Sequence, residues 1–244
     1  MKEIFLVSNV DARNRIVMPS DPGQKQLNSS RQWHTDSSYK TLPSIGSLLH
    51  GIEISRTGGI TQFINMYMVY DELPEPLRRQ VEGRKARHDF AMLSRLTGAP
   101  APSGAERAAV PTVWHPMVRR HPESGRETVY VSPSYTVRFD GWTEEESRPL
   151  LQYLFDHSER PQFVYRHNWR VFDLVMWDNR CTMHRRDPFD PNSRRIMHRT
   201  QIKGESRPVA KQPGSTVTAA AAATNAAATD RRRGLCLLMG VSLC

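Results

Sequence analysis

Cysteine and long apolar runs are both scarce in this sequence of 244 residues. Its three cysteines, Cys181, Cys236 and Cys244, are odd in number and lack the spacing of a metal site, which argues against a secreted disulfide scaffold. The longest apolar runs, 4–7 and 235–239, are far shorter than the roughly 20 residues that span a bilayer. With a mean hydropathy of −0.58, these features predict a cytoplasmic protein without membrane contact.

Acidic residues are also in the minority, since 34 Lys and Arg face 25 Asp and Glu and the formal net charge is +9. A basic excess of this size suits either nucleic acid or small anionic ligands. A nucleic-acid-binding module is one hypothesis, but only the charge motivates it, because the sequence has no RRM, KH, helix-turn-helix or zinc-finger pattern. We therefore expect a small anionic organic substrate and no nucleic acid as partner.

The composition changes after Gly204. Residues 216–229 are nearly all Ala and Thr, and three arginines follow at 231–233. A segment of this kind can bury little apolar surface. We therefore predict a folded domain over residues 1–204 and a low-complexity, disordered tail over residues 205–244.

Short strands dominate the prediction for residues 1–204, for example at 47–54, 61–65, 173–177 and 195–202. The strongest helix signal covers 143–158, where Thr143 and Glu146 have the spacing of a capping box. Residues 98–113 are rich in Pro and Gly and are predicted to form a long mobile loop. This mixture favours a mainly β fold, a sandwich or jelly roll with helices packed outside.

His34 and Asp36 are separated by one residue. In a strand, residues two apart point to the same face, so this imidazole and carboxylate could reach one point. His184 follows a predicted strand and the turn-like segment 178–180, and it is the candidate for a third ligand. Two histidines and one carboxylate on one face of an ion leave positions open, which suits non-haem Fe(II). For His-x-Asp alone, a surface strand with ordinary hydrogen bonds is the alternative.

Arg195 and Arg199 are four residues apart at the start of a predicted strand, and thus on the same strand face. Two guanidinium groups on one face of a buried strand are costly unless they meet anions. The pair is consistent with a carboxylate clamp beside the metal. A basic, solvated strand edge is the alternative that the pattern alone leaves open.

Several stretches, in order along the chain, together resemble the TauD/TfdA family of Fe(II)- and 2-oxoglutarate-dependent dioxygenases. They include Trp33–Asp36, Gly58–Phe63, Phe163–His167, Trp177–Arg180 with His184, and Arg194–Arg199. The resemblance covers residues 3–204. It implies a double-stranded β-helix, the cupin-like jelly roll, and an enzyme that uses Fe(II), 2-oxoglutarate and O2.

The resemblance also implies roles for single residues. His34, Asp36 and His184 match the catalytic iron ligands of the family. Thr61 and Arg195 match the residues that bind the distal carboxylate of 2-oxoglutarate.

Arg199 matches a second arginine, near the cofactor and the anionic head of the substrate. The reaction that the family implies is hydroxylation, often followed by cleavage, of a small organic anion with release of succinate and CO2. An aryloxyalkanoate, a sulfonate or an alkyl sulfate would be such a substrate. The family resemblance does not fix the oligomeric state, and a homo-oligomer is one option.

The chain differs from the family at its beginning, because family members usually carry a further segment before the His-x-Asp motif. The resemblance therefore implies that the N-terminal part of the family fold is missing. A truncated, inactive member that keeps the residues for metal and 2-oxoglutarate is the second hypothesis. A metal hydrolase with the same triad fits less well, because two arginines suit a dicarboxylate co-substrate better than a lone activated water.

Overall fold

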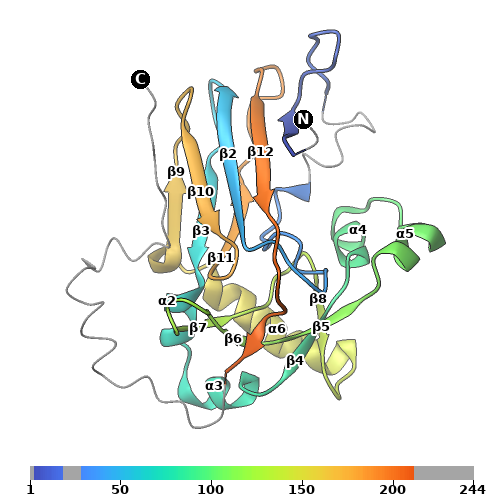
Figure 1. Ribbon diagram of the computed structural model, residues 1–244, viewed down its shortest axis with the longest axis vertical. Helices are drawn as coiled ribbons and strands as arrows, with labels where there is room; N and C mark the ends of the chain where they lie inside the picture. Colours follow the sequence, from blue (N-terminus) through green and yellow to red (C-terminus); the bar gives the residue numbers. More distant parts are fainter. Residues whose placement is uncertain (1–2, 19–28, 212–244) are drawn as a thin grey trace.

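A computed structural model describes residues 3–18 and 29–211, and most of the tail predicted over 205–244 lies outside these ranges. The described chain is mainly β with several helices, as the sequence predicted (Figure 1). In the part that is described, no helix is both long and apolar enough to cross a membrane.

Two antiparallel sheets form a sandwich at one end of the molecule (Figure 1). The first has the strand order β1-β12-β2-β10, with β1 at Phe5–Ser8, β12 at Ile196–Ile202, β2 at Gly46–Glu53 and β10 at Leu174–Asp178. The second has the order β11-β3-β9, with β11 at Thr182–Arg186, β3 at Thr61–Asn65 and β9 at Val164–His167. These seven strands carry Thr61, His184 and Arg199, three of the six residues that the sequence singled out as a site.

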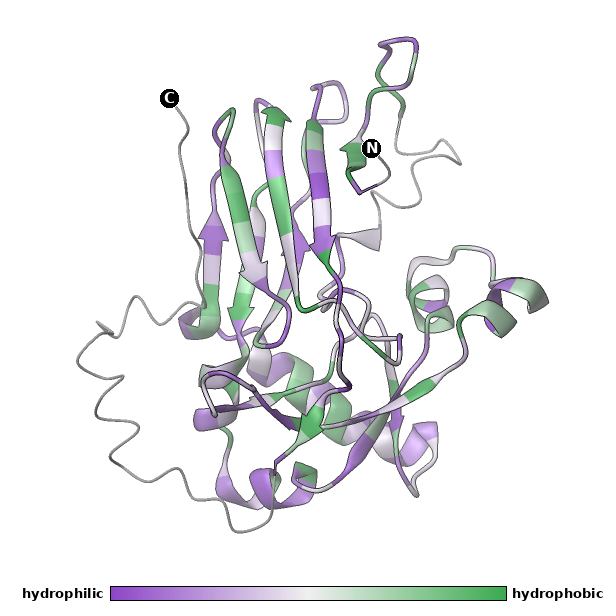
Figure 2. Cartoon of the chain, in the orientation of Figure 1, coloured by the Kyte–Doolittle hydropathy of each residue, from purple (hydrophilic) through white to green (hydrophobic). Residues whose placement is uncertain are grey.

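Apolar side chains fill the space between the two sheets. Leu49, Val175, Trp177 and Met197 of the first sheet pack with Phe63 of the second. Side chains alternate across a strand, and Figure 2 accordingly shows apolar and polar bands along β2, β10 and β12. The inner faces of the two sheets therefore form one small core.

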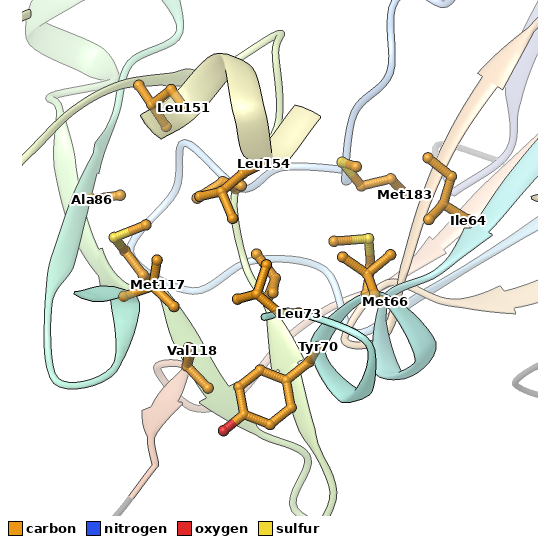
Figure 3. Close-up of a cluster of buried hydrophobic side chains, with 14 of the residues drawn as sticks. Ile64, Met66, Tyr70, Leu73, Ala86, Met117, Val118, Leu151, Leu154 and Met183 are labelled. Carbon is orange, nitrogen blue, oxygen red and sulfur yellow. The ribbon is translucent and has the colours of Figure 1, made fainter. Parts of the chain in front are cut away.

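The second sheet packs its other face against a helical layer. This layer contains α2 (Met66–Asp71) and α6 (Glu144–Ser158). Figure 3 shows Ile64 of β3 and Met183 of β11 beside Met66 and Leu154, in the larger of the two buried clusters. Because alternate residues point to opposite faces, Phe63 and His184 point from the same strands into the sandwich. Because Ile64 and Met183 pack against the helices, their neighbours Phe63 and His184 point toward the site.

Helix α6 begins where the sequence predicted. Thr143 Oγ1 accepts from the backbone of Glu146, whose side chain accepts in turn from the backbone of Thr143. Leu150, Leu151 and Leu154 are buried on one side of the helix. The capping box thus fixes the start of the helix, and the apolar face fixes its packing.

Two smaller sheets and four short helices complete the described chain. The sheets are β5-β4-β8, with β5 at Val113–Pro116, β4 at Lys85–His88 and β8 at Thr136–Phe139, and β13-β6-β7, with β13 at Val209–Ala210, β6 at Val118–Arg120 and β7 at Glu127–Val129. The helices are α3 at Glu75–Val81, α4 at Ala91–Thr97, α5 at Gly104–Ala109 and the 3-10 helix η2 at Pro161–Phe163.

The prediction of one long loop over 98–113 was wrong in its middle. Helix α5 lies there, and Ser103 and Glu106 form a capping box at its start. The Ser-x-x-Glu signal outweighs the neighbouring prolines, which lie outside the helix. Beyond residue 204, β13 pairs with β6, so the described chain keeps regular structure as far as Ala210. The domain boundary at 204 itself stays a prediction.

Candidate active site

The three side chains of the proposed triad lie together, as the sequence predicted. Nε2 of His34 and Nε2 of His184 each lie 3.6 Å from Oδ1 of Asp36, and all three residues are buried. Ligand atoms on adjacent positions of an octahedral ion, at roughly 2.1 Å from it, are about 3 Å apart. A small inward movement would therefore place all three donors on one ion.

The backbone around the triad differs from the strand that we expected. His34 and His184 face each other in an isolated antiparallel bridge, with N···O distances of 3.1 and 2.8 Å. Asp36 lies in the turn that follows, and the next residue, Ser37, has a left-handed φ of 57°. The prediction that His34 and Asp36 share a strand was thus wrong. The turn, rather than strand alternation, brings the carboxylate to the imidazoles.

The orientation and charge of the two imidazoles suit a metal ligand. Nδ1 of His34 lies 2.8 Å from the carbonyl oxygen of Gln32. Because a carbonyl only accepts, Nδ1 carries a hydrogen, and Nε2 is the ring nitrogen that faces Asp36. The ring of His184 packs against Phe63 and Trp177, with centroids 6.1 and 4.7 Å away. Burial first, and then the proximity of a second imidazole in His34, holds the pKa of His184 well below its ordinary value. His184 is therefore neutral, as metal binding requires.

The second oxygen of Asp36 has one hydrogen-bond donor and one ion-pair partner. Oδ2 lies 2.6 Å from Oγ of Ser47, which donates to it, and 2.5 Å from Nη2 of Arg199. Burial alone would raise the pKa of Asp36, but the charge of Arg199, with help from the two histidines, outweighs burial and holds the pKa well below its ordinary value. The carboxylate is therefore ionised, with Oδ1 directed to the histidines and Oδ2 to Ser47 and Arg199.

A pocket beside the triad collects the other predicted site residues. Its lining is formed by Val7, Ser30, His34, Leu49, Thr61, Trp177, His184, Arg185, Arg186, Arg195 and Arg199. The sequence predicted five of these as site residues, and the structure brings all five to the same cavity. Oγ1 of Thr61 accepts from Nε1 of Trp169 at 2.9 Å, so the hydroxyl hydrogen of Thr61 can be donated to a further acceptor.

Arg195 is the most unusual charge in this pocket. It is only 2% exposed, and within the described ranges no acidic side chain forms an ion pair with it. Burial, followed by the charge of Arg186, lowers the pKa of Arg195 to about 9. A buried guanidinium without a counter-charge is unfavourable. Its position next to two histidines and a carboxylate fits a site for an anion that is bound from outside the chain.

The sequence analysis did not identify Arg186 as a residue of the pocket. This residue is buried at the end of β11, opposite Thr61 in the β3–β11 ladder. Its Nη1 donates to the carbonyl oxygen of Asp187 at 2.9 Å, and burial lowers its pKa to about 10. The available signal was its spacing of two from His184, because residues two apart on a strand share a face.

A second group of potential ligands, His121, Asp178 and Cys181, lies elsewhere in the described chain. Here the carboxylate of Asp178 is already occupied, because Nε2 of His121 lies 3.0 Å and Nη2 of Arg180 lies 2.6 Å from its Oδ2. These bonds hold the predicted turn at 178–180 in place. We therefore interpret this group as a hydrogen-bonded corner of the fold.

Comparison with known proteins shows the family of this chain. Residues 3–201 match the family model described as "Taurine catabolism dioxygenase TauD, TfdA family". The chain is 36% identical over 204 residues to the alpha-ketoglutarate-dependent 2,4-dichlorophenoxyacetate dioxygenase of Burkholderia sp. (strain RASC), covering 83% of this chain and 68% of that protein. It is 33% identical over 207 residues to pentalenolactone F synthase of Streptomyces arenae, covering 80% of this chain and 67% of that protein.

Solved structures show the same fold. The crystal structure of AAD-2 in complex with Mn(II) and N-oxalylglycine matches with a TM-score of 0.80 and 30% identity, covering 85% of this chain and 75% of that one. A taurine dioxygenase from Burkholderia xenovorans matches with a TM-score of 0.65 and 31% identity, covering 86% and 70%. The predicted jelly-roll fold is thereby confirmed.

The donor set of the triad suits Fe(II), and Arg195 beside it, which has no acidic partner among the described residues, suits the carboxylate of 2-oxoglutarate. The residues present therefore fit the cofactors of these relatives. Taken together with the family match over residues 3–201, this shows that the chain belongs to the TauD/TfdA family of non-haem iron dioxygenases, which use Fe(II), 2-oxoglutarate and O2.

Proposed function

We propose that this chain hydroxylates a small organic anion in the cytoplasm, with His34, Asp36 and His184 as the ligands of Fe(II). In this proposal Arg195 and Thr61 bind the distal carboxylate of 2-oxoglutarate, and succinate and CO2 are released. The observation that carries the proposal is the buried Arg195, which faces the triad pocket without an acidic partner in the described chain.

The two cofactors, when bound, supply the activation of O2, and the residues of the pocket supply binding and positioning. The guanidinium of Arg195 offers two parallel donors to a carboxylate, and the hydroxyl of Thr61 offers a third. Leu49 and Trp177 form apolar walls of the same pocket. They exclude water, so that the charged contacts inside act in a medium of low dielectric constant.

Arg199 supports an anionic substrate. Its Nη2 forms an ion pair with Asp36, but neither Nη2 nor the buried Nε makes a hydrogen bond within the described chain. A buried donor without a partner is unfavourable, and the carboxylate or sulfonate of a substrate would satisfy it. The names of two relatives, the 2,4-dichlorophenoxyacetate dioxygenase and the (S)-phenoxypropionate/alpha-ketoglutarate-dioxygenase, identify aryloxyalkanoates as a class to test first.

A succinate-release assay tests this proposal. The protein is incubated with Fe(II), ascorbate, 2-oxoglutarate and O2, and a panel of aryloxyalkanoates, sulfonates and alkyl sulfates is screened. We expect at least one anion to stimulate succinate formation and to gain one hydroxyl oxygen or be cleaved.

Two variants make the assay specific. Arg195→Gln should lose activity at low concentrations of the co-substrate, whereas Arg194→Gln should keep it, because Arg194 pairs with Glu53 and does not line the pocket. Absence of succinate with every anion, from a protein that melts cooperatively, would contradict the proposed activity and favour an inactive family member.

A further inference from the structure

We propose that Trp177, Asn179 and Ser47 form a hydrogen-bonded relay that orients the carboxylate of Asp36, so that Oδ1 rather than Oδ2 faces the metal. The inference rests on the proposed role of Asp36 as a metal ligand. Ser47 and Asn179 act as positioning residues, since Ser47 contacts the metal ligand and Asn179 contacts Ser47. Trp177, whose ring also lines the pocket, anchors the relay through its indole N–H. None of the predicted sequence roles included Ser47.

The relay is a continuous line of three hydrogen bonds. Nε1 of Trp177 lies 3.0 Å from Oδ1 of Asn179, Nδ2 of Asn179 lies 3.1 Å from Oγ of Ser47, and Oγ of Ser47 lies 2.6 Å from Oδ2 of Asp36. All four residues are buried. Water therefore offers no easy substitute for any of these bonds.

Chemistry fixes the direction of every bond in the line. The indole N–H of Trp177 can only donate, so the atom of Asn179 that faces it must be the amide oxygen. The amide NH2 then points to Ser47 and donates to its hydroxyl oxygen. The single hydrogen of the Ser47 hydroxyl is left for the ionised carboxylate of Asp36, which can only accept. The indole N–H of Trp177 thus fixes the orientation of the Asn179 amide, and this orientation in turn makes Ser47 the donor to Asp36.

The backbone holds the relay in place. Trp177 and Ser47 are direct partners in the ladder between β10 and β2. The backbone N–H of Asn179 donates to the carbonyl oxygen of Ile45 at 2.9 Å, and its carbonyl oxygen accepts from Nη2 of Arg119 at 2.6 Å. Both the backbone N–H and the backbone carbonyl of Asn179 are therefore held in place, independently of the bonds that its side chain makes.

The relay would make the two oxygens of the Asp36 carboxylate different from each other. The two oxygens of a carboxylate are equivalent until neighbours distinguish them, and a free carboxylate can rotate or bind through both oxygens. Oδ2 of Asp36 is held by Ser47 and by Arg199, but the side chain of Arg199 is 23% exposed and lines the pocket. An anion that binds Arg199 would compete with Asp36 for it. Among the contacts of Oδ2 within the described ranges, only the bond from Ser47 is independent of what the pocket holds.

Binding of Mn(II) to the metal-free protein tests the relay, with free Mn(II) followed by its electron paramagnetic resonance signal. Partners of metal ligands typically change affinity about 10- to 100-fold when removed. We expect Ser47→Ala and Asn179→Leu each to raise the Kd for Mn(II) about tenfold or more. Ser158→Ala is the matched control, because Ser158 is equally buried and donates to the carbonyl oxygen of Leu154 in α6. Its Kd should equal that of the wild type.

The double variant separates a relay from a general loss of structure. If Asn179 acts through Ser47, Asn179→Leu should have little further effect on the Kd when Ser47 is already alanine. Independent structural damage would instead give additive effects. Thermal melting of the metal-free variants checks folding, and if Ser47→Ala does not fold, the Kd of Asn179→Leu alone decides.

The outcomes distinguish the relay from the metal site itself. If the wild type does not bind Mn(II), or if His184→Ala binds it equally well, the proposed metal site is wrong. If His184→Ala abolishes binding but Ser47→Ala or Asn179→Leu leaves the Kd unchanged, the metal site stands and the relay is overturned. Additive effects in the double variant would overturn it as well.

Discussion

Nη2 of Arg199 lies 2.5 Å from Oδ2 of Asp36, and Oδ1 of the same carboxylate lies 3.6 Å from Nε2 of both His34 and His184. One carboxylate therefore connects the proposed metal site to the arginine proposed to meet the substrate. Arg199 and Asp36 stabilise each other's charge: burial would lower the pKa of Arg199, but Asp36 raises it above the ordinary value. A substitution at either residue should therefore affect both the proposed metal site and the proposed substrate contact.

Replacement of Arg199 by glutamine should affect the substrate more than the co-substrate. Hydrogen bonds to charged groups contribute about 1.5–3 kcal/mol, which corresponds to about 10- to 100-fold in affinity. We expect the KM for the anion that scores in the succinate assay to rise by this factor in Arg199→Gln. The KM for the co-substrate, 2-oxoglutarate, should change much less. Equal changes in the two KM values would show that Arg199 does not contribute selectively to substrate binding.

Replacement of Arg195 by methionine should weaken binding of the co-substrate without destabilising the protein. The guanidinium is buried and has no acidic partner in the described ranges, and removal of such a charge is often neutral or stabilising. We expect the Tm of Arg195→Met, without ligands, to equal or exceed that of the wild type. The rise in Tm that 2-oxoglutarate causes with Mn(II) should disappear. A large drop in Tm would mean that Arg195 has a structural partner.

The hydroxyl of Thr61 offers a finer test of the same pocket. Thr61→Val removes the hydroxyl with little change of shape, and Thr61→Ser keeps it. The valine variant also leaves Nε1 of Trp169 without its acceptor. A lost hydrogen bond to a charged group predicts a KM for the co-substrate about 10-fold higher or more in Thr61→Val, and a nearly normal value in Thr61→Ser. If both variants behave like the wild type, Thr61 does not bind the co-substrate.

Two buried histidines should make the fold sensitive to mild acid. Burial, together with His115 and Arg119, holds the pKa of His88 well below its ordinary value, and burial with the charge of Arg119 lowers the pKa of His115 to about 4. In the unfolded chain, histidine has a pKa of about 6.5. Between these values the unfolded chain binds more protons than the folded protein, so stability falls as pH decreases.

The expected slope is at most about 1.4 kcal/mol per pH unit for each histidine. Urea unfolding at pH 7, 6 and 5 measures it, above the range in which most carboxylates titrate. His115→Gln, whose amide can still donate to the carbonyl oxygen of Lys40, should reduce the slope. Equal stability at pH 7 and 5 would contradict the assignment of neutral, buried histidines.

The sequence predicted the main parts of the site better than their local backbone. Residue type and spacing made His34, Asp36, His184, Arg195 and Arg199 candidates, and the resemblance to the TauD/TfdA family supplied their expected roles. Arg195 and Arg199 both line the pocket as expected, although Arg195 lies just before β12, which begins at Ile196. Strand alternation failed for His34 and Asp36, because a bridge of single residues and a left-handed turn at residue 37 have no strong sequence signal.

Long-range contacts account for what the sequence could not predict. Strand β11, which carries His184 and Arg186, is defined by its pairing with β3 more than one hundred residues earlier in the chain. The bond from Ser47 to Asp36 and the bond from Asn179 to Ser47 likewise depend on the packing of β2 and β10. Serine and asparagine are common in loops and strands, so no local pattern marks them as part of a site.

Anaerobic optical spectroscopy tests the central claim most directly. Fe(II) and then 2-oxoglutarate are added to the metal-free protein, and the visible spectrum is recorded before any O2 is admitted. The account predicts a new metal-to-ligand charge-transfer band for the wild type and for the control Arg194→Gln, and none for His184→Ala. No band in the wild type, or an undiminished band in His184→Ala, would contradict the assignment of His34, Asp36 and His184 as the iron site.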